Sequence, residues 1–231
     1  MGDQQTVDHC IEEITARFLD GIEDSPTDLD ALAQRMGVRR IVDDPSLYVP
    51  GELRRIDGQL EIVVLSGLAD GRRRFTIAHE LGHVVFEQTG RNPPRHGLEV
   101  EKYCDQLASA FLMPYGAFLA SVGDLPSIAS VLAASRVHRV SMTAGFWRLC
   151  HLKRMLAFEI NKDRVVWSCG LSSRTMAELR TQLRELLDAA RRGYSGSTNV
   201  EVMLNSGFRR FNIECMNLQA DARSVFLART V

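Results

Sequence analysis

The sequence predicts an α+β fold in two parts, a larger one over residues 1–151 and a smaller one over residues 152–231. Three observations lead to this prediction. Apolar residues recur at helical spacing through much of the first part, and apolar–polar alternation replaces that spacing from Met155 onward. The charge also changes sign: residues 1–134 hold 12 basic and 21 acidic residues, a net of −9, whereas residues 135–231 hold 16 and 8, a net of +8.

The first part is expected to be mainly helical. Its helices are predicted over residues 5–20, 27–37, 72–88, 99–113, 126–136 and 141–152. Its strands are predicted over residues 40–42, 52–56 and 59–65. The last two strands flank Asp57-Gly58, a dipeptide preferred in two-residue hairpin turns. The last two helices could form a DNA-reading helix-turn-helix, but we favour a supporting helical hairpin, because the turn lacks glycine and the second helix carries apolar Phe146 and Trp147.

The second part reads as a small module of strands and one helix. Strands are predicted over residues 156–160, 165–167, 200–204, 208–218 and 224–228, and a helix over residues 173–192. A strand pair, a helix and three further strands make an α+β module. Its positive charge would attract phosphate or an acidic surface, or would dock the module on the acidic first part.

Composition excludes several classes of protein. The chain is 45% hydrophobic and 25% charged, as in ordinary globular proteins. No apolar run approaches the roughly 20 residues that span a bilayer, so no membrane partner is expected. The first residues, MGDQQTVDHC, lack the apolar core of a secretory signal, and the five cysteines lack paired spacing. We therefore expect reduced thiols and a cytoplasmic location.

The motif H-E-x-x-H lies on the predicted helix 72–88, at His79-Glu80-Leu81-Gly82-His83. Residues four apart share one face of a helix, so both imidazoles could bind one metal ion. Zinc is the metal expected, because it would lower the pKa of a bound water towards roughly 7, and Glu80 would accept the proton as the base. Two ordinary histidines on a helix are the alternative.

A catalytic zinc needs a third protein ligand and one open position. The next helix offers Glu101 as that ligand and Asp105 one turn later, where its carboxylate could orient a ligand imidazole. Glu99 competes as the ligand but has no acidic residue four positions later, and Glu101 could also be a solvated surface acid.

These segments resemble the ImmA/IrrE family of metallopeptidases. The resemblance is carried by R-F-T-I-A-H-E-L-G-H at 74–83, by E-x-x-x-D-x-x-A at 101–108 and by F-L-M-P at 111–114, within roughly residues 25–150. It implies a zincin-like domain with an active-site helix, a small antiparallel sheet and a helical extension. It also implies one zinc ion per chain, held by His79, His83 and Glu101, with Glu80 as the catalytic base.

Cys104 departs from the family, which usually has alanine there and asparagine at the position of Asp105. Aspartate keeps the hydrogen-bonding role. Cys104 lies one helical turn from Glu101, so a thiolate there could bind zinc in the open position and inhibit the enzyme. The alternative is a small buried cysteine at an alanine site.

Two further features of a peptidase stay open in the sequence. A donor for the oxyanion is needed, and the candidates are Arg95, His96, Tyr103, Tyr115 and His138. The hairpin over residues 52–65 could bind the substrate as an added strand.

The resemblance also implies a regulatory role: cleavage of a helix-turn-helix repressor, which releases a stress, mobile-element or phage-defence operon. Single-stranded DNA is the activator that it suggests for the second part, whose candidate contacts are Arg148, Lys153, Arg154, Arg191, Arg192, Arg209 and Arg210. Phe208 and Phe211 could stack on bases, although core packing is the commoner role of Phe in strands. The rival interpretation is a DNA- or protein-binding regulator with a structural zinc site. The oligomeric state does not follow from the sequence.

Overall fold

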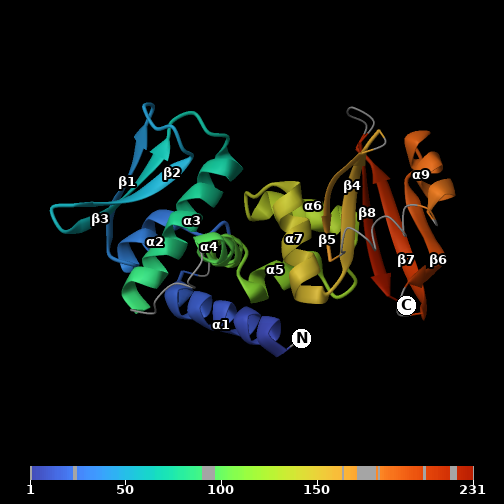
Figure 1. Cartoon of the computed structure of the whole chain (residues 1–231), viewed down its shortest axis with the longest axis horizontal. Helices are drawn as coiled ribbons and strands as arrows, with labels where there is room; N and C mark the ends of the chain where they lie inside the picture. The colour runs from blue at the N-terminus through green and yellow to red at the C-terminus, as the bar shows by residue number, and fades with distance from the viewer. Residues whose placement is uncertain are drawn as a thin grey trace. The chain divides into compact units, whose positions relative to one another are not determined.

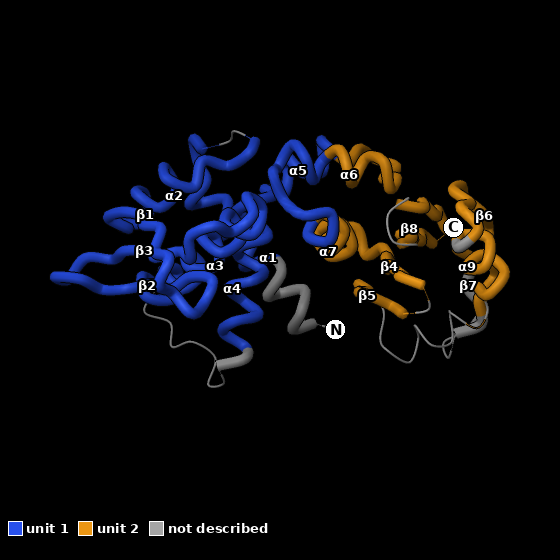
Figure 2. Tube along the Cα trace, turned by 90° about the horizontal axis from the view of Figure 1, so that it is seen from above, with its two compact units in different colours: residues 1–121, 134–144 blue, residues 122–133, 145–231 orange. Residues whose placement is uncertain are grey.

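Figure 1 shows a computed structural model of the chain, which describes residues 2–22, 25–89, 97–162, 164–170, 181, 183–204, 207–218 and 223–230. Within these ranges, side chains are not described for residues 2–8, 89, 97–98, 191, 203–204 and 207–209. The chain divides into two compact units, residues 1–121 with 134–144 and residues 122–133 with 145–231 (Figure 2). The boundary near residue 151 stays a prediction, and the α+β class is confirmed.

The first unit packs helices against a three-stranded sheet. Its strands are β1 (Val38–Asp44), β2 (Gly51–Ile56) and β3 (Gln59–Leu65). Its helices are α1 (Gly2–Leu19), α2 (Leu29–Arg35), α3 (Asp70–Thr89), α4 (Gly97–Leu112) and α5 (Tyr115–Val122). The central strand β3 is antiparallel to β2 but parallel to β1, so the sheet is mixed and not wholly antiparallel as expected. The connection from β1 carries the chain to the far edge, where β2 forms, and leaves the central place to β3.

Local signals in this unit have the predicted effects. The turn between β2 and β3 places Asp57 at φ 51° and Gly58 at φ 80°, the left-handed values that a tight hairpin turn requires. Asp28 caps α2, because its Oδ1 accepts the amide N–H groups of Asp30 and Ala31, each at 3.0 Å. The hairpin and the start of α2 are therefore confirmed.

Helix α3 is the central helix of the first unit, with contacts to the sheet and to α4. Its apolar residues Ile77, Ala78, Leu81, Val84 and Val85 are buried in the core that these elements share. The guanidinium of Arg74 is buried near the start of α3 and donates to the carbonyl of Thr27 at 2.9 Å. The hydroxyl of Thr27 donates in turn to the carbonyl of Phe111 at 2.8 Å, so α3, α4 and the segment before α2 are tied together.

One helix of the first unit was not predicted. Pro114 was expected only to stop the preceding helix, and α4 does end at Leu112. The chain then starts α5 directly, with the amide of Phe118 donating to the carbonyl of Pro114. Proline has no N–H to lose at the start of a helix and has a suitable φ there, so it can begin a helix as well as end one.

The second unit is built on a five-stranded antiparallel sheet with the order β5-β4-β8-β7-β6. Its strands are β4 (Leu156–Asn161), β5 (Arg164–Cys169), β6 (Gly196–Leu204), β7 (Gly207–Asn217) and β8 (Arg223–Thr230). Helix α9 (Arg184–Arg191) packs on β7 and β8. It forms the end of the predicted helix 173–192, of which residues 173–180 lie outside the described residues. All five predicted strands are confirmed.

Two faces of this sheet have different contents. On the α9 face, the rings of Phe158 and Phe226 stack with centroids 4.6 Å apart. On the other face, Glu159 is fully buried and accepts from the indole N–H of Trp167 at 2.7 Å and from Arg223 at 2.5 Å. A buried carboxylate is tolerated there because both of its oxygens have charged or polar donors.

The helices α6 (Ile128–Val137) and α7 (Met142–Lys153) belong partly to each unit. The amide of Ile128 donates to Glu214 of β7 at 3.0 Å, and the ring of Phe146 lies 5.6 Å from that of Trp167 in β5. The pair thus supports the second unit, as we favoured. None of the described helices is both long enough and apolar enough to cross a membrane.

Candidate functional site

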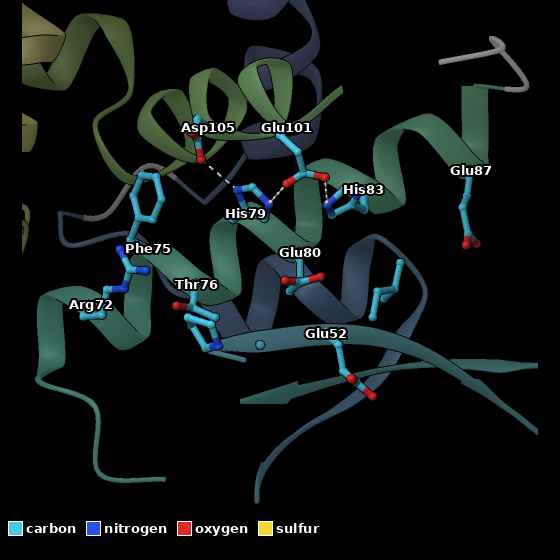
Figure 3. A pocket seen from close by; sticks show the side chains of 13 residues that line it. Glu52, Arg72, Phe75, Thr76, His79, Glu80, His83, Glu87, Glu101 and Asp105 are labelled. Carbon is cyan, nitrogen blue, oxygen red and sulfur yellow. Dashed lines mark hydrogen bonds and ion pairs between the residues drawn. The ribbon is translucent and has the colours of Figure 1, made fainter. Parts of the chain in front are cut away.

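Helix α3 presents the two motif histidines side by side. His79 and His83 are one turn apart, and their ring centroids are separated by 5.1 Å. Both rings point towards α4, whereas the side chain of Glu80 points towards β2 (Figure 3). The apolar residues of the motif helix face the core, so the fold fixes the orientation of this helix and with it the direction of the histidines.

Helix α4 brings Glu101 to these rings. One carboxylate oxygen of Glu101 lies 3.1 Å from Nε2 of His79, and the other lies 3.7 Å from Nε2 of His83. Two ligand atoms bound to zinc at about 2.0–2.1 Å in tetrahedral geometry are roughly 3.3 Å apart. The observed separations lie on either side of that value, and two imidazoles with one carboxylate are a catalytic zinc donor set. The residues therefore fit a zinc ion.

Asp105 contacts His79 through Nδ1, the ring nitrogen that does not face Glu101. Its Oδ1 lies 2.8 Å from Nδ1 of His79, which places the ring proton on Nδ1 and leaves the Nε2 lone pair for a metal. Burial lowers the pKa of His79, but the hydrogen bond and charge of Asp105 outweigh it and the net pKa is raised. Burial and the neighbouring His79 lower the pKa of His83.

Glu80 sits in the wall of the cleft, 7% exposed, between the histidines and β2. Burial raises the pKa of its carboxyl, while the charge of His79 and a hydrogen bond from the backbone of Leu53 act in the opposite direction. A general base is most effective when its pKa lies near the working pH, so a raised pKa suits Glu80 for this role at neutral pH. The carboxylate of Glu80 forms no hydrogen bond with His79 or His83, so it could act on a molecule in the cleft.

The cleft at this site has a volume of about 880 Å³ and three walls. Its lining comes from β2 and the residue before it, from one face of α3, and from α4: Pro50, Gly51, Glu52, Leu53, Arg72, Phe75, Thr76, His79, Glu80, His83, Glu87, Glu101 and Asp105. Strand β2 is an edge strand among the described strands of its sheet. The amide of Leu65 donates to the carbonyl of Pro50, so the alternate residues Gly51, Leu53 and Arg55 direct their backbone groups away from β3.

Two glycines permit the close packing of this site. A Cβ on Gly51 would lie 2.4 Å from Cγ2 of Thr76, so a side chain there would push β2 away from α3. A Cβ on Gly82 would lie 2.9 Å from Cα of Cys104 and 3.1 Å from its Cβ. Any side chain at position 82 would therefore separate α3 from α4, which together carry the three candidate ligands.

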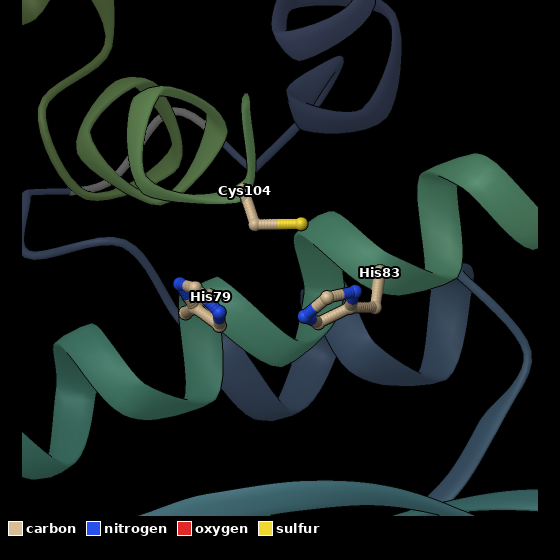
Figure 4. A group of neighbouring side chains, drawn as sticks. All are labelled: His79, His83 and Cys104. Carbon is tan, nitrogen blue, oxygen red and sulfur yellow. The ribbon is translucent and has the colours of Figure 1, made fainter. Parts of the chain in front are cut away.

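Cys104 is fully buried between α4 and the histidines of α3 and does not line the cleft (Figure 4). Its sulfur and one ring nitrogen each of His79 and His83 lie within 4.8 Å of one another. Burial, with the nearby Glu101, Glu80 and Asp105, raises the pKa of the thiol to about 12. Cys104 therefore combines a position close to the histidines with an environment that favours the neutral thiol.

None of the oxyanion candidates that the structure describes lines the cleft. Among the described candidates, Tyr103 packs against Phe86, Tyr115 is 54% exposed outside the cleft, and His138 is buried beside Phe118. Arg95 and His96 lie outside the described residues. Sequence reasoning assigned no role to six residues that line the cleft: Pro50, Gly51, Arg72, Phe75, Thr76 and Glu87. The spacing of Arg72, Phe75 and Thr76 to His79 places them on the motif face of α3, and this signal could have identified three of them.

The proposed nucleic-acid contacts fare unequally. Arg148 is only 3% exposed, so its assignment to a nucleic-acid surface is wrong: charge patterning does not distinguish a buried arginine from an exposed one. Phe211, likewise 3% exposed, is a core residue. Arg210 is exposed and paired with Glu201 at 2.6 Å, and Lys153, Arg154 and Arg192 are exposed. The side chains of Arg191, Phe208 and Arg209 lie outside those that the structure describes.

The mixed sheet, the central helix with two histidines and the glutamate from the next helix define a metallopeptidase-type domain. The family model of the IrrE N-terminal-like domain, Peptidase_M78, matches residues 33–144. Residues 33–144 therefore form an IrrE N-terminal-like domain. The predicted resemblance is confirmed.

One solved structure shares the fold of nearly the whole chain. It is a Mycobacterium tuberculosis transcriptional regulator with a TM-score of 0.65 and 16% sequence identity, and the match covers 96% of this chain and 76% of that one. Among curated protein sequences we find no significant match.

Proposed function

We propose that this protein is a zinc-dependent, site-specific endopeptidase that cleaves a helix-turn-helix transcriptional repressor. The observation that carries the proposal is the convergence of His79, His83 and Glu101 within 3.1–3.7 Å, beside the carboxylate of Glu80 in the wall of a cleft. A purely structural zinc site closes all four positions with protein ligands and has no use for that carboxylate.

Each residue of the site has a distinct role in this proposal. His79, His83 and Glu101 hold one zinc ion per chain, and Asp105 fixes the tautomer and orientation of His79. Bound zinc supplies a Lewis acid that lowers the pKa of water to about 7 and polarises a carbonyl. Glu80 accepts a proton from water in the cleft and delivers it to the leaving amine.

Strand β2 would hold the substrate in an extended conformation. The backbone groups of Gly51 and Arg55 and the carbonyl of Leu53 point away from β3 and are available to a peptide that adds to this edge. The amide of Leu53 already bonds to Glu80, so the strand that binds the peptide also positions the base. A cleft open along an edge strand suits cleavage within a chain.

A regulatory role is supported by the family and by the fold shared with a transcriptional regulator. We propose that the second unit gates the peptidase in response to single-stranded DNA, with the exposed Lys153, Arg154 and Arg192 as the first contacts to test. Cleavage of the repressor then releases a stress or phage-defence operon.

The test is a catalogue of new protein N-termini in the native host. Wild type and Glu80→Gln are expressed with and without DNA damage, and the termini are compared by mass spectrometry. A terminus within one helix-turn-helix repressor, present in wild type and absent in Glu80→Gln, is expected, and it should increase after damage. No Glu80-dependent terminus under either condition would favour the rival function, a binding regulator with a structural zinc site.

We further propose that Cys104 is an inhibitory ligand: in an inactive resting state its thiolate occupies the coordination position of the metal that water or substrate would otherwise take. The sulfur lies within 4.8 Å of a nitrogen of each histidine, so a small movement of α4 would bring it to the metal. A bound metal deprotonates a thiol that is otherwise neutral, which would overcome the raised pKa of Cys104.

Cobalt substitution tests this role directly. Cobalt-loaded wild type is expected to show an intense thiolate-to-cobalt absorption in the near ultraviolet, and Cys104→Ala is expected to lose it and to have higher basal cleavage. Cys150→Ala, a change at another buried cysteine, is the control and should keep the absorption. A wild-type spectrum identical to that of Cys104→Ala, with equal cleavage, would leave Cys104 as a packing residue.

A further inference from the structure

Arg72 stands apart from the other arginines around the cleft. It lines the cleft, is exposed, and has no partner among the side chains that the structure describes. Its neighbour Arg73 is held by Asp43 at 2.9–3.0 Å, and Arg74 is buried on the carbonyl of Thr27. Arg72 therefore brings an uncompensated positive charge to the wall of the cleft.

The opposite end of the cleft is already neutralised. The acidic residues that line it, Glu52 and Glu87, are paired with Arg54 and Arg55 respectively. The cleft is thus electrostatically asymmetric along α3. The end near Arg72 is also close to the N-terminus of α3, where the helix dipole adds to the attraction for an anion.

Phe75 completes a subsite with Arg72. It lies one turn further along α3, is half-buried in the cleft wall, and its ring centroid is 6.4 Å from that of His79 (Figure 3). An apolar surface beside a free guanidinium fits a side chain with a short aliphatic stem and a terminal carboxylate.

The direction of β2 indicates which side of the scissile bond this subsite serves. Gly51 packs on Thr76, and Arg55 reaches Glu87, so β2 runs in the same direction as α3. A peptide added antiparallel to β2, the more stable pairing, enters near Glu87 and leaves near Arg72. Arg72 precedes His79 by seven residues, about 10 Å along the helix, which an extended chain covers in about three residues.

We propose that Arg72 and Phe75 form a specificity subsite that binds a carboxylate of the substrate, about three residues to the C-terminal side of the scissile bond. The inference rests on the proposed peptidase function and names its substrate class: peptide segments that carry a negative charge after the cleaved bond. The carboxylate comes from an Asp or Glu side chain or from the C-terminus of the chain, and both sources have the same chemistry.

The test compares zinc-loaded wild type, Arg72→Glu and Arg136→Glu on degenerate peptide libraries with free or amidated C-termini. Arg136 is the matched control, because it is an exposed arginine at the end of α6 that lies outside the cleft and has no partner among the described side chains. Wild type and Arg136→Glu are expected to favour a carboxylate at one position after the cleaved bond by roughly five- to tenfold in kcat/KM. Arg72→Glu is expected to lose that preference and to favour Lys or Arg there.

The two library forms separate the two sources. A preference that survives amidation comes from a side chain, and one that disappears comes from the terminal carboxylate. A profile for Arg72→Glu equal to that of wild type would overturn the inference.

A binding measurement distinguishes failure of the subsite from failure of the peptidase proposal. Fluorescence anisotropy with zinc-loaded Glu80→Gln compares a Glu-containing peptide with its Gln counterpart. Suppose that wild type cleaves nothing, but that Glu80→Gln binds the Glu peptide more tightly than the Gln peptide, and that the double variant Glu80→Gln, Arg72→Glu does not. The subsite is then supported and the peptidase function is not. Equal binding of the two peptides, together with no cleavage preference, overturns the subsite.

Discussion

Replacing Glu80 with glutamine should lower kcat/KM roughly 10²–10⁴-fold on a peptide or repressor that the wild-type protein cleaves. Glutamine keeps the shape of the side chain and can still interact with the backbone of Leu53, but it cannot accept a proton. Since Glu80 does not contact the metal ligands, the variant should bind zinc as tightly as wild type. Steady-state kinetics and metal analysis of the same preparations measure both quantities.

The matched control is Glu87→Gln. Glu87 lines the same cleft on the same helix, but its carboxylate is paired with Arg55 and it is not one of the candidate metal ligands. Its loss should change kcat/KM by no more than a few fold, because an exposed ion pair contributes little. A Glu80→Gln protein that retains wild-type kcat with full zinc would exclude Glu80 as the base and point to another group in the cleft.

Two carboxylates on α4 should differ sharply in their effect on zinc binding. Glu101→Ala removes one of three protein ligands, so the variant is expected to lose stable zinc after dialysis. Asp105→Ala leaves all three ligands in place and removes only the hydrogen bond to Nδ1 of His79, so the zinc affinity should fall about 10–100-fold. Competition with a chromophoric chelator measures both affinities.

Glu99→Ala is the control for these variants. Glu99 is exposed in the first turn of α4 and is absent from the cleft lining, so its removal should leave the zinc affinity unchanged. If Glu101→Ala retained wild-type affinity while Cys104→Ala lost it, the third ligand would be the thiol and not the carboxylate. Circular dichroism of each variant separates loss of a ligand from loss of the fold.

The candidate ligands could be proposed from the sequence because their placement depends on local spacing. His79 and His83 share a helical face whatever surrounds that helix, and the E-x-x-x-D pair has the same property on α4. Local spacing does not predict that α3 and α4 pack so that Glu101 lies against the rings of both His79 and His83. At the level of the sequence, only the family resemblance indicated this packing.

The rest of the cleft depends on packing that no short motif encodes. Glu52 and Leu53 become part of the site because β2 lies against α3, which in turn requires the small residue at position 51. Arg148 was assigned to a nucleic-acid surface because of the positive charge of its segment, and this was wrong because the fold buries its side chain. Helix α5 was missed because Pro114 ends one helix and starts the next, and a single residue signal cannot distinguish the two roles.

The contact between Gly82 and Cys104 sets the spacing of the two helices that carry the candidate metal ligands. Metal–ligand bonds tolerate about 0.2 Å, whereas even the methyl group of alanine at position 82 would stand 2.9 Å from a backbone atom of α4 and force the helices apart by more than that. Gly82 has no side-chain atom that could bind a metal, so a search for candidate ligands does not find it. Gly82 nevertheless determines the geometry of the site, because the absence of a side chain there sets the distance between α3 and α4, which carry the candidate ligands.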